Sequence, residues 1–357
     1  KFQKLKEEAK KKKQEGKKEG EKKEEGKEKD KKKEEEEKLT EEDVEMNESA
    51  IKLVEGVLRV LMSLRNVSVN YTVNNGTTLP GFTEDPQYLG NDWNINAPGI
   101  PFIIGIQDTN FKWEAAKNQW LSQDPTLSTL FRSTSTENLA IQANLEPIKG
   151  FKINVDMTRR ESHNNQAVFK FDELLEEHIL NSQVESGSYS QSFWSLPTSL
   201  KGKWDDEISE TYEQFLNNRF VVAQRLSQDR FGTNAIDDST SFPIGYSGAS
   251  QDVIIPAFLA AYSNTNAADV PLSAFRPIPA PNWRVTYNGL SKLDFVKDFA
   301  RNININHAYR STYTITNFTT NLKYAEDQQW EEGKNVEPYY SIQQISISEQ
   351  LSPLIGI

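Results

Sequence analysis

Apolar and polar side chains alternate with a period of two in several stretches of this 357-residue chain, and this alternation constrains the fold more than any other feature. The clearest case lies on either side of Lys149 and Gly150. A period of two places the two sets of side chains on opposite faces of a sheet, and a Lys-Gly pair suits a tight turn. We therefore predict a β-hairpin over 139–157. Its apolar face carries Ile141, Leu145, Ile153 and Val155, and its polar face carries Gln142, Asn144, Glu146, Lys152, Asn154 and Asp156.

The same alternation returns in 281–315 and again from Tyr340. The predicted apolar face of the first stretch carries Trp283, Val285, Tyr287, Ile303, Ile305, Tyr309 and Tyr313. The predicted polar face carries Arg284, Thr286, Asn288, Asn302, Asn304, Asn306, Arg310 and Thr312. In the last stretch Glu349 falls among the apolar positions and breaks the pattern. Together these stretches predict an all-β fold of amphipathic antiparallel strands with small helical insertions.

The rest of the chain divides by composition. Residues 1–38 hold 17 lysines and 13 acidic residues and predict a charged, low-complexity linker. The mixed signs argue against nucleic-acid binding, because the glutamates would repel phosphates. Apolar residues at helical spacing predict a helix over 39–64. Strands with a long loop follow over 65–160, with a strand at 102–106 and a helix at 113–121. We expect 161–280 to be a folded insertion, extracellular or lumenal, with helices at 171–181 and 207–216, and strands again over 281–357.

Catalytic chemistry is not indicated. The chain has three histidines and no cysteine, which excludes disulfides and thiolate metal sites. The Gly245-Tyr246-Ser247-Gly248 stretch resembles a nucleophile elbow, but its second glycine comes one residue too early. No glycine-rich phosphate loop is present. We therefore expect no enzyme activity, no catalytic residue, no cofactor and no metal site.

Alternation alone does not identify what the apolar face contacts. A transmembrane β-barrel turns this face to lipid, whereas a soluble β-sandwich turns it to a second sheet. We favour the barrel because aromatic residues recur along the apolar positions, as in the girdles of outer-membrane barrels. In that reading the apolar set faces lipid and the polar set faces the lumen. The chain starts without methionine and stops inside an apolar run, so we interpret it as an internal piece of a longer protein.

Several long segments resemble the SprA (Sov) family. The most extensive are 281–292 (PNWRVTYNGLSK), 307–313 (HAYRSTY), 346–357 (SISEQLSPLIGI) and 251–262 (QDVIIPAFLAAY). Shorter segments are 65–68 (RNVS), 76–82 (GTTLPGF) and 146–148 (EPI). The resemblance spans about 57–357, and the charged tract is similar in composition only.

That family forms the outer-membrane translocon of the type IX secretion system, which also supports gliding motility. The resemblance implies that the chain supplies several strands of a very large single-chain β-barrel in the bacterial outer membrane, reaching the cell surface. It also implies secreted cargo proteins as partners, with one protein covering a lateral opening and another plugging the periplasmic mouth. The alternatives are another outer-membrane β-barrel transporter or receptor, and a soluble secreted β-sandwich binding module.

Overall fold

The computed structural model describes residues 62–106, 108, 110–127, 129–199, 209–292, 303–324 and 333–357. The predicted linker over 1–38 lies outside the described residues, as does the predicted helix over 39–64 as far as residue 61. The chain divides into two compact units, Lys1–Met62 and Ser63–Ile357. Every strand and helix described below belongs to the second unit.

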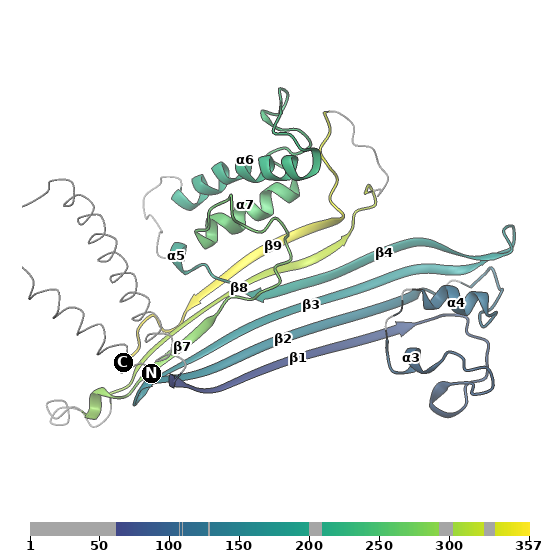
Figure 1. The fold of residues 1–357 in the computed structure, drawn as a ribbon, viewed down its shortest axis with the longest axis horizontal. Coiled ribbons are helices and arrows are strands. Elements are labelled where there is room, and N and C mark those ends of the chain that lie inside the picture. The colour runs from purple at the N-terminus through teal and green to yellow at the C-terminus, as the bar shows by residue number, and fades with distance from the viewer. Residues whose placement is uncertain are drawn as a thin grey trace, which may run out of the picture. The chain divides into compact units, whose positions relative to one another are not determined.

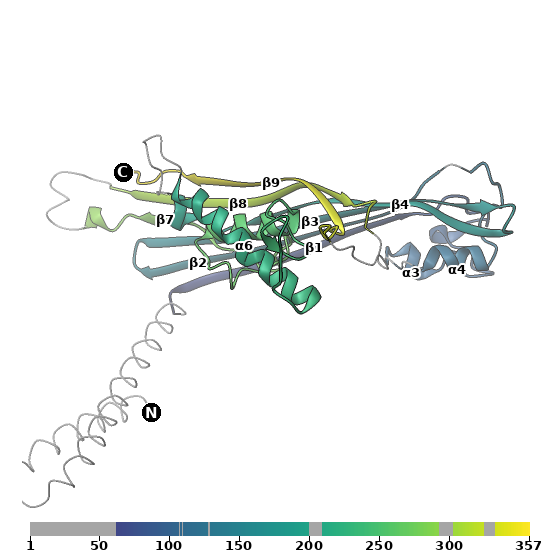
Figure 2. The same cartoon turned by 90° about the horizontal axis from the view of Figure 1, so that it is seen from above.

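Long antiparallel strands form the body of this unit, in the order β1, β2, β3, β4, β8, with β7 between β3 and β8 and with β9 beside β8. Figures 1 and 2 show the strands running alongside one another. Their bounds are β1 (Leu64–Thr78), β2 (Phe131–Ile148), β3 (Phe151–Asp172), β4 (Glu177–Ser192), β7 (Asn282–Tyr287), β8 (Ile305–Thr320) and β9 (Tyr340–Leu351). The predicted hairpin is β2–β3, with Leu145 opposite Ile153. The expectation of a mainly antiparallel β fold with few helices is confirmed.

One strand position in the sheet is filled by two separate segments of the chain. β4 pairs with β3 from Glu177 opposite Asp172 to Gln191 opposite Arg159. β7 continues the same register, with Asn282 opposite Asp156. On the other side β8 pairs with β7 through residues 305–309 and with β4 through residues 312–319. β4 and β7 are therefore two halves of one strand, and residues 193–281 leave the sheet between them.

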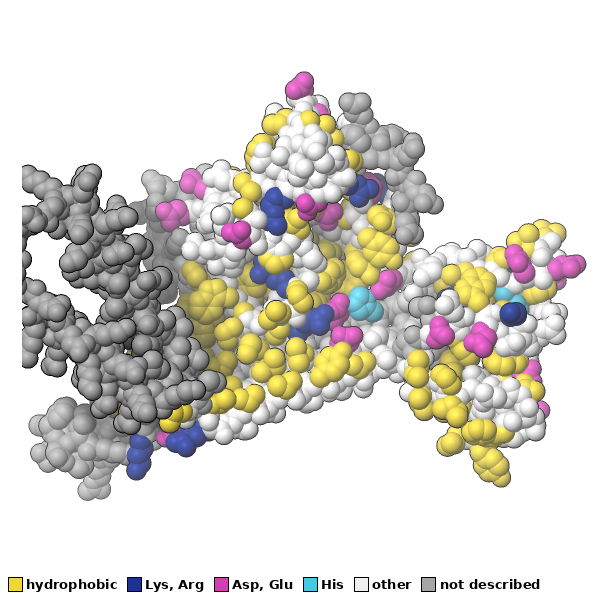
Figure 3. Space-filling model, viewed as in Figure 1, with side chains coloured by type: hydrophobic (Ala, Val, Ile, Leu, Met, Phe, Trp, Pro, Cys, Tyr) yellow, Lys and Arg dark blue, Asp and Glu magenta, His cyan; other side chains and the backbone are white. Residues whose placement is uncertain are grey.

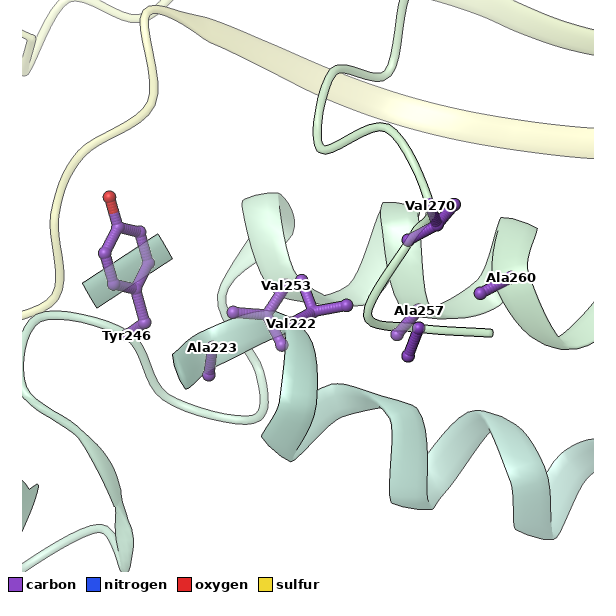
Figure 4. Packing of buried hydrophobic residues seen from close by; sticks show 8 residues of the cluster. Val222, Ala223, Tyr246, Val253, Ala257, Ala260 and Val270 are labelled. Atoms are coloured by element: carbon purple, nitrogen blue, oxygen red, sulfur yellow. The ribbon is translucent and has the colours of Figure 1, made fainter. Parts of the chain in front are cut away.

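These inserted residues fold into a small helical layer (Figure 1). It contains α5 (Leu196–Ser199), α6 (Glu210–Phe231), α7 (Gln251–Ser263) and a two-stranded ribbon of β5 (Ile236–Asp237) and β6 (Phe242–Pro243). α6 ends at Gly232, whose φ of 68° is the left-handed conformation that favours glycine. Small and branched residues of α6 and α7 pack together in the core between them, with Tyr246 and Val270 from the loops (Figure 4).

The insertion packs on the apolar side of β4, β8 and β9. Ile255 and Leu259 of α7 form one core with Tyr189, Tyr313 and other side chains of these strands. Gln251 adds a polar contact to β9: its Oε1 accepts from the backbone N–H of Ile342 at 2.7 Å, and its Nε2 donates to the carbonyl of Tyr340 at 2.8 Å. The insertion is therefore held to the sheet by a shared core and by the hydrogen bonds of the Gln251 side chain to the backbone of β9.

The connection between β1 and β2 forms a third packed region, with η1 (Tyr88–Gly90), α3 (Ile100–Ile103) and α4 (Phe111–Lys117). Ala115 and Leu121 pack there against Phe131 and Phe169 of the sheet. The predicted helix over 113–121 is confirmed as α4, displaced toward the N-terminus. The predicted strand over 102–106 is wrong, because Pro101 stands in the first turn of α3 and starts a short helix.

The boundaries of the predicted insertion also differ from the structure. Residues 161–192 form the end of β3, a turn and β4, so the insertion begins at Phe193. The predicted helix over 171–181 is wrong: Asp172 Oδ1 accepts from the backbone N–H groups of Leu174 and Leu175 and makes a turn between the strands. The predicted helix over 207–216 is confirmed in α6, which continues to Phe231.

Candidate functional site: the two faces of the sheet

The polar face of the sheet is hollowed where β2, β3, β7, β8 and β9 meet. The hollow has a volume of about 500 Å³, and the polar side chains that line it are Gln142, Asn144, Asn154, Asp156, Arg284, Arg310, Gln350 and Ser352. The strand register explains this gathering, since Asn144 lies opposite Asn154, which in turn lies opposite Arg284. Six residues predicted for the polar face therefore meet at one concave site.

Other residues predicted for this face lie around the hollow. Lys152 is opposite Thr286, which is opposite Asn306. Glu146 closes the β2–β3 turn, with its Oε1 accepting from the N–H of Gly150 and its Oε2 3.5 Å from Arg65 Nε. The remaining members are Asn288, Asn304 and Thr312, while Asn302 lies outside the described residues. The assignment of these residues to a lumen stays a prediction.

The opposite face is apolar over one end of the sheet. β1 is exposed there, and the exposed fractions of Val69 and Tyr71 are 64% and 57%. Residues predicted for the apolar face that are half-buried are Ile141, Leu145, Ile153, Val155, Trp283, Val285, Tyr287, Ile303 and Ile305. Figure 3 shows hydrophobic side chains gathered over this face, with charged and histidine side chains among them.

Tyr309 and Tyr313 depart from the predicted lipid-facing set. Their exposed fractions are 1% and 0%. Tyr313 packs in the core beneath the insertion, and the hydroxyl of Tyr309 accepts from the N–H of Ser195 at 2.9 Å. Both rings contact protein in place of lipid, because residues 193–281 fold back over this part of the face.

The exposed apolar area has an oblique border. The last apolar residue on this face steps back along neighbouring strands through Val73 on β1, Leu139 on β2 and Met157 on β3. Val73 lies opposite Glu137, and Leu139 lies opposite Arg159, so each strand turns polar two residues before its predecessor. Two residues span ~6.7 Å along a strand and neighbouring strands are ~4.8 Å apart, which inclines the border by roughly 55°.

A charged cluster lies on this face beyond the border. His163 joins two carboxylates, with Nε2 2.9 Å from Glu161 Oε1 and Nδ1 2.7 Å from Glu185 Oε1. Arg159 bonds to the second oxygen of Glu161. The hydrogen bond to Glu161 raises the pKa of His163 and lowers the pKa of Glu161, while burial opposes both shifts. His163 therefore ties β3 to β4 through its contacts with Glu161 and Glu185.

A second polar cluster closes the gap between β4 and β7, and sequence reasoning did not find it. Ser195 Oγ donates to Glu349 Oε1 at 2.8 Å and lies 2.8 Å from Ser311 Oγ. Asn282 Oδ1 accepts from the N–H of Ser311 at 2.8 Å. The only signal in the sequence was Glu349, whose place among apolar residues is explained by Ser195.

The described helices include none long and apolar enough to cross a membrane. Within the described residues, no group of three or more histidine and acidic side chains is arranged to hold a metal ion. Comparisons of the chain with protein-family models and with curated proteins found no match.

Proposed function

We propose that this chain forms part of the wall of a very large transmembrane β-barrel in the bacterial outer membrane. In this proposal the barrel is a SprA (Sov)-type translocon that conducts folded cargo proteins in type IX secretion and supports gliding motility. The exposed apolar face contacts lipid, and the hollowed polar face belongs to the lumen. A cover for a lateral opening and a periplasmic plug are the proposed partners.

The oblique border of the apolar area is the observation that carries the proposal. Strands of outer-membrane barrels are tilted by ~35–45°, so a flat bilayer cuts them along an oblique line. The border on β1, β2 and β3 is inclined by roughly 55° to the perpendicular of the strands, which is somewhat steeper. Polar and charged residues begin on the far side of this line, as expected where strands leave the hydrocarbon region.

The two faces of the sheet support the same proposal. A barrel wall is concave toward its lumen, and the hollow lies on the polar face. The apolar face is not covered by a second sheet among the described strands, as a β-sandwich would require. The polar set is rich in amides and hydroxyls, which stay hydrated and hold a passing protein weakly. We infer no enzyme activity, because conduction needs no catalytic residue.

Membrane placement is tested by two adjacent substitutions on β2. Ile141 lies opposite Val69 and Met157 in the apolar area, whereas Gln142 lies opposite Ser68 and Asp156 on the polar face. Near the middle of a bilayer, Ile141→Arg should cost about 2–4 kcal/mol. Gln142→Arg should be tolerated, since it gains a carboxylate neighbour. The measurement is the fraction of intact protein that assembles into outer membranes, and equal assembly of both variants would refute the placement.

Conduction is tested by removing residues 209–275 from the intact protein. We expect barrel insertion to be retained, because this segment lies outside the strands of the large sheet and its removal shortens the connection between β4 and β7. Secretion should fail, or the pore should leak large solutes, if the helical layer shapes the path. Wild-type secretion together with wild-type permeability would remove the insertion from the mechanism.

A further inference from the structure

The hollow on the polar face carries an excess of positive charge. Arg284 of β7 and Arg310 of β8 line it, and Asp156 is its only carboxylate. Arg310 Nη2 lies 4.0 Å from Asp156 Oδ2, at the limit of an ion pair, and its side chain is 68% exposed. Within the part of the chain that the structure describes, Arg284 has no ion-pair or hydrogen-bond partner. One guanidinium is therefore uncompensated in a chain whose net charge is −11.

The register holds the two guanidinium groups near each other. Arg284 lies opposite Ala308, and Arg310 follows two residues later on the same face of β8. Ala308 has only a methyl side chain, so the space between the two arginines stays open. Ala308 forms part of the floor of the hollow. Both arginines line the same open space, and a guanidinium group suits carboxylate binding because its planar fork of N–H donors matches the two carboxylate oxygens.

Neutral amides surround the arginines. The amide side chains that line the hollow are Gln142, Asn144, Asn154 and Gln350. All four are exposed, and the structure shows no hydrogen bond from them to another described side chain. An amide both donates and accepts, so these groups are able to pair with the N–H and C=O groups of an extended peptide. A volume of about 500 Å³ lies in the range of ligand sites.

We infer that the hollow is a binding site for acidic polypeptide segments, with Arg284 and Arg310 holding carboxylates and the amides holding the peptide backbone. This inference rests on the proposed function, since it supposes that polypeptides pass along the polar face. It adds a substrate preference to a wall otherwise lined mainly by neutral groups. Acidic segments of a cargo protein dwell at this point of the path, and basic segments do not.

Fluorescence anisotropy with a labelled hexaglutamate peptide tests the site on the intact protein in detergent micelles. Arg284→Gln and Arg310→Gln should each weaken binding about three- to tenfold, as expected for loss of one charge-assisted bond at an exposed site. Lys152→Gln is the matched control, because Lys152 is an exposed cation on the same face that does not line the hollow. It should change the affinity less than twofold.

Two further probes decide the ligand class. Labelled hexalysine should not bind measurably, and hexagalacturonate, which carries carboxylates on a sugar chain, should bind more weakly than hexaglutamate. Equal losses in all three variants would reduce the effect to general electrostatic attraction and overturn the site. Tighter binding of hexagalacturonate would overturn the assignment to polypeptides.

Failure of this inference is distinguishable from failure of the proposed function. If the arginine variants bind hexaglutamate normally while only Ile141→Arg blocks membrane assembly, the barrel wall stands and the site falls. If Ile141→Arg and Gln142→Arg assemble equally while binding still depends on both arginines, the membrane placement falls and the anion site remains.

Discussion

Asn282 is the side chain on which the continuity of the divided strand most depends. Its Oδ1 accepts from the N–H of Ser311 at 2.8 Å, and the exposed fractions of the two residues are 2% and 0%. Asn282→Ala leaves that N–H buried without its acceptor. The loss of such a bond costs about 1–3 kcal/mol of stability. The cost is near the lower value if a water molecule enters the vacated space and accepts from the N–H.

The expected result has a local and a global readout. The free energy of unfolding in urea should fall by the stated amount, and the amide of Ser311 should exchange roughly 5–150-fold faster, since 1.4 kcal/mol is a factor of ten. Asn288→Ala is the control, because Asn288 is exposed at the end of β7 and its loss should change the stability by less than about 0.5 kcal/mol. Unchanged exchange at Ser311 in Asn282→Ala would refute the role of Asn282 in joining the two halves.

Three further perturbations address packing and charge. Gly187→Ala should destabilise the sheet by about 1–3 kcal/mol or more in urea titrations, because a Cβ there would lie 2.0 Å from the carbonyl oxygen of Ser162. Gly76→Ala should be mild, because a Cβ there meets only a rotatable threonine hydroxyl. Equal effects of the two substitutions would contradict the close approach at Gly187. Leu259→Ala should cost about 2–5 kcal/mol, since this side chain is fully buried between α7 and the sheet, whereas Leu174→Ala at a 94% exposed position should be near neutral. Burial raises the pKa of Asp252 in the folded protein. The protonated carboxyl favours folding below the unfolded-state pKa of about 3.9, and this contribution is lost as pH rises through the folded-state pKa. The stability of Asp252→Asn relative to the parent should therefore increase from pH 3 to pH 7, and a constant difference would contradict the raised pKa.

Local sequence patterns predicted the elements whose neighbours are close in the chain. The β2–β3 hairpin followed from alternation and a tight turn, because both its register and its two faces are set within 139–157. The start of α6 was predicted within 207–216, whereas its continuation to Phe231 was not. Alternation also predicted β9 from Tyr340 onward.

Elements that depend on distant partners were missed. β4 is mostly polar, with Gly187 near its middle, and it becomes a strand because β3 and β8 pair with it on both sides. Its first residues belong to a stretch whose apolar spacing resembles a helix, which led to the wrong helix over 171–181. Tyr309 was placed with the lipid-facing residues because alternation shows which face a side chain shares and does not show what covers that face. The convergence of Arg284 and Arg310 on one hollow likewise needed the register of β7 and β8.

The division of one strand into β4 and β7 has a consequence for how the chain folds. Ser192 and Asn282 must arrive next to each other before either β3 or β8 has a complete neighbour, and bringing distant residues together carries an entropic cost that local contacts do not repay. The contacts between α6 and α7 are much closer in sequence, so the helical layer is able to form early and shorten the distance between the two halves. A chain with a disrupted helical core should then stall with residues 151–156 of β3 paired only to β2, leaving that edge open to the strands of other molecules.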